Sequence, residues 1–415
     1  MNAFSYAFLA ALALGLCMRA WLAARHMRHV TAHREHVPQS FADRISLPAH
    51  RKAADYTVAK TKLHIAETIA DAAVLLALTL GGGVQWLYDA WAAWFTADSY
   101  SHGIALIGSV VFIGGLVQLP FGMYRTFGIE ARFGFNRMTA RLYVADLIKH
   151  LVVAAALGLP LLFVVLWLMN RTGDWWWIYA WLAWMAFNLL VLVLFPTVIA
   201  PLFNKFSPLQ DERLRARIEG LLRKCGFRTK GVFVMDGSRR SSHGNAYFTG
   251  LGAAKRIVFF DTLLSRLAPH EIEAVLAHEL GHYKLHHIAK RIGFAFLLSL
   301  GFLALLAFLA EQGWFYEGLG VQTPGTAVAL LLFMLAVPVF AFFMQPLGNA
   351  YSRKHEYEAD AYAADQSQPD ALIHALVKLY EDNAATLTPD PLHSAFYDSH
   401  PPAGLRIARL QALAR

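Results

Sequence analysis

Cysteine is almost absent from this 415-residue chain, which contains only Cys17 and Cys225. Two isolated cysteines supply neither a disulfide framework nor a CxxC metal site. Any metal must therefore be held by histidine and carboxylate side chains. Charged residues are also scarce, at 16% of the chain, whereas 57% of the residues are hydrophobic. This balance excludes an ordinary soluble enzyme.

The hydrophobic residues form seven blocks, each long enough to cross a bilayer as a helix. They lie at roughly Phe4–Leu22, Ile65–Leu87, Ile104–Met123, Leu151–Met169, Trp175–Ile199, Ile292–Phe308 and Ala327–Met344. The first block is long for the apolar region of a signal peptide, and no small-residue cleavage site follows it before His26, so we expect it to be retained. The sequence thus predicts a mainly α-helical, multi-pass membrane protein.

Lysine and arginine are distributed unevenly among the loops. They are frequent after the first, third, fifth and seventh blocks, as in Arg25–Lys62 and Arg125–Lys149. The loop after the second block and the segment Gln312–Gly325 contain neither. This alternation predicts an N-terminus outside and a C-terminus in the cytoplasm. It also accounts for the net charge of +8, and since no basic run is interleaved with aromatic residues, no nucleic-acid partner is expected.

The chain divides into two parts on this pattern. Residues 1–205 are an N-terminal membrane region with five predicted spans, and residues 206–415 are a soluble part interrupted by a membrane hairpin at about 291–347. The soluble part begins with an amphipathic helical pattern at Leu209–Cys225. Strand-like runs follow at Gly231–Met235 and Ala246–Thr249, and a short apolar run lies at Ile257–Phe260; this part is predicted to contain a small β-sheet.

The segment His278-Glu279-Leu280-Gly281-His282 has the HExxH pattern on a predicted helix that begins at Pro269. A helix places residues i and i+4 on one face, so His278 and His282 can reach one metal ion. Glu279 is then the general base of a metalloprotease. The pattern predicts zinc-assisted hydrolysis of a peptide bond.

Two histidines leave tetrahedral zinc one protein ligand short. The HExxHxxGxxH solution is excluded, because Leu285 and Ile288 stand where that pattern needs Gly and His. A second helix, Arg353–Asp360, offers a glutamate instead. In it Glu356 and Asp360 share a face at i, i+4, so Glu356 is predicted as the third ligand and Asp360 as the partner of a ligand imidazole or an aid in moving a proton. Glu358 points elsewhere and is expected to be solvated.

These motifs resemble those of the gluzincin metallopeptidases, and specifically the type I CAAX prenyl endopeptidases. Further segments carry the resemblance across nearly the whole chain. They are Phe133–Asn136 (FGFN), Pro196–Leu209, Ser242–Tyr247 (SHGNAY), Arg256–Leu264 and Ser399–Pro402 (SHPP) followed by Arg406. The resemblance implies a membrane zinc metalloendopeptidase whose spans enclose a hollow chamber, with the gluzincin site at its cytoplasmic end. It also implies removal of a C-terminal tripeptide from isoprenylated CAAX proteins in eukaryotic members.

One sequence feature supports a polar chamber independently. His64, Glu67 and Asp71 share one helix face at the start of the second predicted span. Ionisable residues at membrane depth normally face a cavity or another polar group. The alternative is that the span begins later and leaves His64 and Glu67 in water.

The peptide substrate is expected to add its backbone to an edge strand at Asn245, Ala246 and the residues that follow, since an extended peptide can hydrogen-bond there whatever its side chains. His400 and Arg406 are candidates to stabilise the oxyanion, or alternatively to dock the C-terminal tail. The expected partners are the lipid bilayer and a peptide or protein substrate that is lipidated or membrane-bound.

Two departures from the family pattern affect the interpretation. Leu405 occupies a position where the family usually has a glutamate before the arginine, so an ion pair of the tail is missing. The segment Gln411–Arg415 carries no lysine-based retrieval signal, and the composition is rich in Ala and Arg, which favours a bacterial inner membrane. Prenylated CAAX proteins are not expected in bacteria, so the native substrate stays open.

Three other functions stay open on the sequence alone. A quality-control protease for misfolded membrane proteins would use the same zinc chemistry on another substrate. A transporter would use the polar helix face as a pathway but would leave HExxH unexplained. A catalytically silent scaffold is disfavoured because every residue that the chemistry needs is present. Metal analysis together with a protease assay separates the enzyme from the last two.

We predict the topology from the loop charges. Reporter fusions after Gly313 should report the outside face, whereas fusions near Asn136 or at Arg415 should report the cytoplasm. Paired alkaline phosphatase and fluorescent protein reporters measure this directly. A C-terminus found outside would overturn the predicted orientation.

Overall fold

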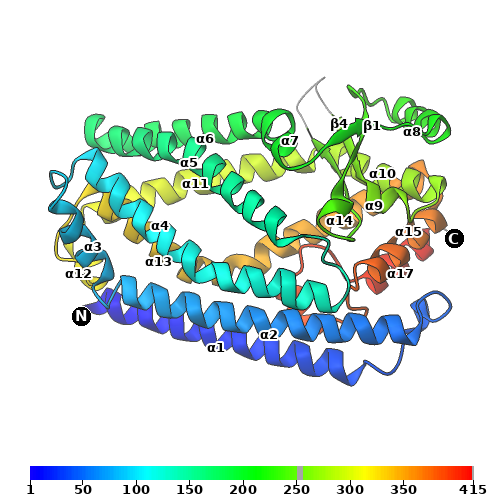
Figure 1. Cartoon of the computed structure of the whole chain (residues 1–415), viewed down its shortest axis with the longest axis horizontal. Coiled ribbons are helices and arrows are strands. Elements are labelled where there is room, and N and C mark those ends of the chain that lie inside the picture. The colour runs from blue at the N-terminus through cyan, green and yellow to red at the C-terminus, as the bar shows by residue number, and fades with distance from the viewer. Residues whose placement is uncertain (250–255, 414–415) are drawn as a thin grey trace.

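The computed structural model describes residues 1–249 and 256–413, so the reporter position Arg415 lies outside the described residues. Long helices make up most of the molecule, and a small sheet lies at one end (Figure 1). The first helices are α1 (Ala3–Ala32), α2 (Leu47–Leu78), α3 (Gly83–Ala92), α4 (Tyr100–Met123), α5 (Ala140–Arg171), α6 (Trp176–Leu194) and α7 (Ala200–Phe203). The later helices are α8 (Glu212–Lys224), α9 (Asp261–Leu264), α10 (Pro269–Lys284), α11 (His287–Ala310), α12 (Gly313–Gly318), α13 (Thr326–Ala341), α14 (Gln345–Gln366), α15 (Pro369–Asp382), α16 (Pro391–Tyr397) and α17 (Ala403–Leu413).

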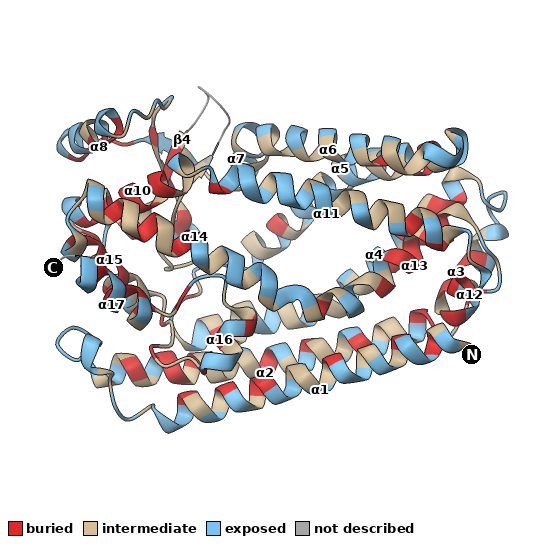
Figure 2. Ribbon diagram, turned by 180° about the vertical axis from the view of Figure 1, so that it is seen from behind, coloured by how far each residue is buried: buried red, intermediate tan, exposed pale blue. Residues whose placement is uncertain are grey.

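The membrane helices agree with the predicted number of spans. Among the described residues, six helices are long and apolar enough to cross a membrane, or seven if the bent pair α2–α3 counts as one span. Buried residues gather where α10, α14, α15 and α17 meet, whereas α5, α6 and α11 are mostly exposed or half-buried (Figure 2). Exposed apolar surface on long helices is what lipid contact requires. The chain is therefore a multi-pass membrane protein, as predicted.

The second predicted span, Ile65–Leu87, is wrong as one continuous helix. Helix α2 ends at Leu78, and α3 continues at an angle of 54° after a short break. The cause is the run Gly81–Gly83, in which Gly82 has φ of 77°, a left-handed conformation that glycine adopts without a steric penalty. Thr79 caps the end of α2 by donating its hydroxyl to the carbonyl of Leu75 at 2.7 Å.

The predicted polar face of α2 lines the interior of the membrane region. Figure 1 shows α1 and α2 together along one side, α5, α6 and α11 along the other, and α4 and α13 between them. Two cavities of about 750 and 580 Å³ lie along α1 and α2, and His64 and Glu67 line both. Glu67 is paired with Arg125, and Asp71 accepts a hydrogen bond from Gln118. These ionisable groups are thus partnered inside a chamber.

The sheet contains β1 (Phe206–Pro208), β2 (Val232–Met235), β3 (Ala246–Thr249) and β4 (Arg256–Phe260) in the order β1-β2-β4-β3. Strands β2 and β4 are parallel, and the other two pairs are antiparallel. The two predicted strand-like runs are confirmed as β2 and β3, and the short apolar run at Ile257–Phe260 forms most of β4. Strand β1 was not predicted, because three residues that end in proline show no alternation of apolar and polar side chains.

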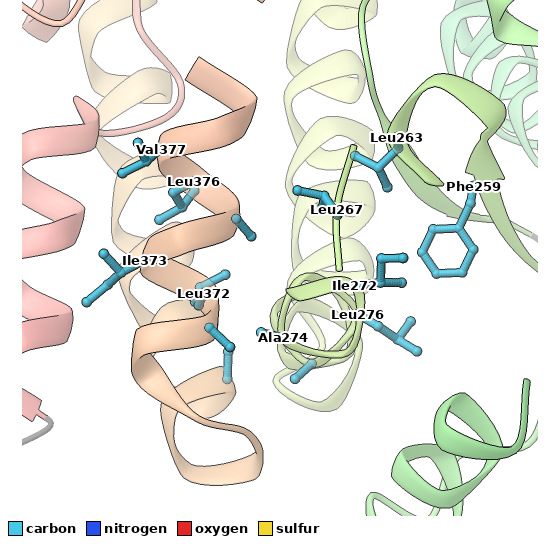
Figure 3. Close-up of a cluster of buried hydrophobic side chains, with 14 of the residues drawn as sticks. Phe259, Leu263, Leu267, Ile272, Ala274, Leu276, Leu372, Ile373, Leu376 and Val377 are labelled. Carbon is cyan, nitrogen blue, oxygen red and sulfur yellow. The ribbon is translucent and has the colours of Figure 1, made fainter. Parts of the chain in front are cut away.

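Helix α10 is the centre of the soluble part. In Figure 3 it is seen end-on, with α15 on one side and β4 with α9 on the other. Ile272, Leu276 and Leu280 are at most 2% exposed, and they belong to one core with Phe259 of β4 and Leu372 of α15. Full burial of such a side chain contributes about 1.5–3 kcal/mol. The HExxH helix is therefore held rigidly from two sides.

Helix α14 crosses α10 at Gly281, with no room for a side chain between them. A Cβ atom at Gly281 would lie 3.0 Å from Cα of Ala359, 3.1 Å from its carbonyl oxygen and 3.2 Å from Cβ of Tyr362. These neighbours are mainly backbone and cannot rotate away. The glycine within HExxH therefore allows α10 and α14 to touch.

We expect Gly281→Ala to destabilise the protein by about 1–2 kcal/mol, because overpacking outweighs the gain in helix propensity. The measurement is the thermal unfolding midpoint of purified protein in detergent. The control is Gly220→Ala in α8, where a Cβ would meet nothing within 4 Å and the midpoint should stay equal or rise. A Gly281→Ala protein as stable as the Gly220→Ala protein would contradict the packing argument.

Candidate metal centre

Helix α10 presents its two histidines on one face because its start is fixed by several contacts. Pro269 occupies the first turn, and the Glu271 carboxylate accepts a hydrogen bond from the backbone amide of Ala268 at 2.7 Å. Lys378 of α15 donates to the same carboxylate at 2.7 Å. His278 and His282 follow two to three turns later, 7% exposed and half-buried respectively.

The three predicted ligand side chains form a triangle, which Glu356 joins through both of its carboxylate oxygens. Nε2 of His278 lies 3.3 Å from Nε2 of His282 and 3.5 Å from Oε2 of Glu356, and Nε2 of His282 lies 3.3 Å from Oε1 of Glu356. Tetrahedral zinc with bonds of roughly 2.0–2.2 Å separates its ligand atoms by about 3.3–3.6 Å. Glu356 is 2% exposed, and its Oε2 has only imidazole nitrogens near it, those of His278 at 3.5 Å and His400 at 2.8 Å. The donor set and its spacing therefore fit a tetrahedral metal with one open position.

Asp360 holds the first histidine, one turn along α14 from Glu356. Its Oδ1 lies 2.8 Å from Nδ1 of His278, so the imidazole directs Nε2 toward the other ligands. Burial lowers the pKa of His278, but the hydrogen bond to Asp360 and the neighbouring Glu356 raise it further, to about 9. A metal ion that binds here displaces a proton from this imidazole.

Arg406 and His400, both from the C-terminal tail, lie in different environments. Arg406 is 7% exposed and donates two hydrogen bonds to Asp360, at 2.6 and 2.8 Å. His400 has a 64% exposed side chain, and its Nδ1 lies 2.8 Å from Oε2 of Glu356. The tail thus docks through Arg406 although Leu405 replaces the usual glutamate, and the exposed His400 imidazole contacts Glu356 at the edge of the site.

Asn245 and Ala246 are not part of this cluster. They lie at the start of β3, which is the last strand of the sheet, and no described strand pairs with its outer edge. Ala246 and Phe248 pack against the core that contains Leu276 and Leu280 of α10. The strand and the HExxH helix therefore belong to one rigid unit.

The FGFN and SHGNAY segments, more than a hundred residues apart in the sequence, lie side by side. The carbonyl of Phe135 accepts a hydrogen bond from the amide of Ser242 at 3.2 Å, and Asn136 forms a β-bridge with Ser241. The His243 imidazole stacks on the Phe135 ring at 4.5 Å. The membrane region thus contacts the chain directly before β3.

The expectation that Glu358 is solvated is wrong. His287 donates a hydrogen bond to its carboxylate at 2.9 Å, and the side chain is only 37% exposed. The reason is the turn between α10 and α11. His286 adopts a left-handed conformation with φ of 58°, which returns His287 toward α14. The sequence signal for this contact was a third histidine, His287, five residues after His282. On one continuous helix these two residues would lie on different faces, so no contact between them was expected.

Two family models match the chain. The first, described as CAAX prenyl protease N-terminal, five membrane helices, covers residues 26–205, and Peptidase family M48 covers residues 208–414. CAAX prenyl protease 1 of Saccharomyces cerevisiae is 36% identical over 75% of this chain and 73% of its own. The human CAAX prenyl protease 1 homolog is 30% identical over 94% and 91%.

A solved structure supports the same assignment. The chain superposes on the crystal structure of S. mikatae Ste24p with a TM-score of 0.91, at 31% identity and over 99% of both chains. The sequence matches and the superposition both indicate the same family, and the His–His–Glu triangle is consistent with a metallopeptidase. This chain is a membrane-embedded metallopeptidase of family M48 and belongs to the CAAX prenyl protease 1 homologues.

Proposed function

We propose that this chain is a zinc endopeptidase that cleaves lipidated peptide or protein substrates near their C-terminus. The observation that carries the proposal is the triangle of His278, His282 and Glu356, in which both imidazole Nε2 atoms lie 3.3 Å apart and each lies within 3.5 Å of a Glu356 oxygen, close enough to share one zinc ion. When bound there, zinc polarises the scissile carbonyl and makes a water molecule acidic. Family membership implies a metal, and two imidazoles with one carboxylate are a ligand set of catalytic zinc.

The proton transfers fall to Glu279. It follows His278 directly on α10 and is half-buried, so its carboxylate stands one step round the helix from the ligand face. In our proposal Glu279 takes a proton from the attacking water and gives it to the leaving amine. His400 faces the cluster from the tail and donates to the oxyanion as it forms, whereas Arg406 acts through Asp360 by fixing its position.

The substrate backbone is proposed to extend the sheet at β3. Main-chain hydrogen bonds from Asn245 and Ala246 onward give affinity without selecting side chains, which suits an enzyme that recognises its substrates mainly by position and lipid. The lipid has a candidate groove of about 1040 Å³ between α11, α13 and α14. It is lined almost entirely by apolar side chains and extends to Tyr351, five residues before Glu356 on α14.

The names of the relatives suggest a prenyl group as the lipid. The loop charges support an active site that faces the cytoplasm. The bacterial inner membrane stays a proposal from composition, whereas the relatives named above are eukaryotic proteins. The division into a membrane region (1–205) and a peptidase part (206–415) is likewise our proposal.

We expect Glu279→Gln to lower the cleavage of a farnesylated CAAX peptide by a factor on the order of 10² or more, because the amide cannot accept the proton of the water. Zinc content should stay at one per chain, since Glu279 is not a ligand. The assay is product formation measured by mass spectrometry with purified protein, and the same peptide without its farnesyl group tests the need for lipid.

The matched control is Glu273→Gln. Glu273 lies on the same helix but is paired with Arg217, away from the triangle, so its loss should leave the rate unchanged. If Glu279→Gln cleaves the peptide at the wild-type rate, the proposed mechanism is wrong even in a protein that binds zinc.

A further inference from the structure

A second group of histidines and a carboxylate lies directly beside the triangle. It consists of His287, the first residue of α11, and of His355 and Glu358 on α14. His287 is 1% exposed and His355 is 2% exposed. Their rings stack at 4.0 Å with an angle of 9° between their planes. Buried polar side chains are normally hydrogen-bonded, so the partners of these residues indicate their role.

The group is joined to the metal centre through one contact. Nδ1 of His282 lies 3.1 Å from Nδ1 of His287, and Nε2 of His287 lies 2.9 Å from Oε2 of Glu358. A ligand imidazole, a second imidazole and a carboxylate thus follow one another at hydrogen-bond distance. The three residues also have the composition of a metal site, so two interpretations compete.

The imidazole tautomers distinguish the hydrogen-bond chain from a second metal site. This step rests on the proposed function, in which His282 binds the metal through Nε2. A neutral imidazole that binds through Nε2 carries its proton on Nδ1. His282 is therefore the donor in the contact with His287, and Nδ1 of His287 is the acceptor. His287 then carries its own proton on Nε2, which donates to Glu358. A second metal at that nitrogen would have to displace this proton and break the hydrogen bond to Glu358.

We propose that His287 and Glu358 position the ligand His282 through a hydrogen-bond chain, and that the group does not bind a second metal. This hydrogen-bond chain has the same role for His282 that Asp360 has for His278. In that case the contact is direct, with Nδ1 of His278 lying 2.8 Å from Asp360. Each ligand imidazole is thus linked to a carboxylate: His278 directly to Asp360, and His282 to Glu358 through His287. Such partners fix ring orientation and raise the basicity of the ligand, and their loss usually lowers metal affinity 10- to 100-fold.

His355 has a different role in this arrangement. Its ring covers the His287 ring on one face and contacts the Tyr351 ring at 4.3 Å on α14. Its Nδ1 is buried with no hydrogen bond from a described residue. The stacked plane of His355, rather than its nitrogen, therefore keeps the His287 ring in line with His282 and Glu358.

The test uses purified full-length protein loaded with zinc or with cobalt. Metal affinity is measured by competition with a chelator, the ligand field by the visible absorption spectrum of the cobalt form, and the metal content by elemental analysis. We expect one metal per chain. His287→Leu should lower the affinity about 10- to 100-fold and shift the cobalt spectrum. His287→Asn keeps an acceptor near the position of Nδ1 and should restore much of the affinity.

Two further variants separate the interpretations. His355→Phe keeps the stacked ring without its nitrogens and should bind one metal with wild-type affinity. Glu358→Gln retains an acceptor for Nε2 of His287 and should also resemble the wild type, whereas Glu358→Leu should lose affinity. Because Glu358 is partly exposed, Glu358→Leu tests the chain even if His287→Leu does not fold.

Some outcomes would overturn the proposal. Two metals per wild-type chain, with one lost in His355→Phe, would establish a second metal site instead. Unchanged affinity and an unchanged cobalt spectrum in both His287→Leu and Glu358→Leu would show that the chain does not act on His282. Failure of the proposed function looks different, because the wild type would then bind no metal, or His278→Ala and His282→Ala would retain it.

Discussion

The close crossing of α10 and α14 is the constraint on which the site depends. Gly281 leaves no side chain between the helices, and its absent Cβ would lie 3.0 Å from the backbone of Ala359. Only at this separation can His278 and His282 of one helix and Glu356 of the other meet at 3.3–3.5 Å. Core packing of α10 between α15 and β4 holds the crossing in place. The ligand geometry is therefore a consequence of helix packing and needs no loop to form.

This geometry gathers several charges where solvent is scarce. Glu356, Asp360 and Arg406 are at most 7% exposed, and an unpaired charge in such a place costs several kcal/mol. Arg406 compensates Asp360 through two hydrogen bonds. With zinc in place, three carboxylates, those of Glu279, Glu356 and Asp360, balance the two charges of the metal and the one of Arg406. The proposed metal thus belongs to the electrostatic balance of the core, and not only to the chemistry.

Much of the fold and of the site could be predicted from the sequence because the signals are local. Helical spacing placed His278 with His282 and Glu356 with Asp360, and short strand-like or apolar runs indicated β2, β3 and β4. Block length gave the number of spans. The features that were missed depend on geometry between elements. The glycine run at Gly81–Gly83 bends a span that hydropathy presents as continuous.

The missed partner of Glu358 has the same kind of cause. The helix breaks at His286 through a left-handed residue, a conformation that is uncommon for any residue other than glycine and that the sequence does not place at a particular histidine. His287 therefore lies against α14. Glu358, which helical spacing directs away from the metal ligands, has the buried His287 as its hydrogen-bond partner. Arg406 is a further case. Its place was expected only from resemblance, and tertiary packing decides that it holds Asp360.

The central claim is that Glu356, and not Glu358, completes a zinc site with His278 and His282. Zinc content of the purified protein, measured by inductively coupled plasma mass spectrometry after exposure to saturating zinc and removal of the excess, tests it most directly. We predict one zinc per chain for the wild type and for Glu358→Ala, and none for Glu356→Ala. Zinc retained by Glu356→Ala but lost from Glu358→Ala would contradict the assignment of the third ligand and the account built on it.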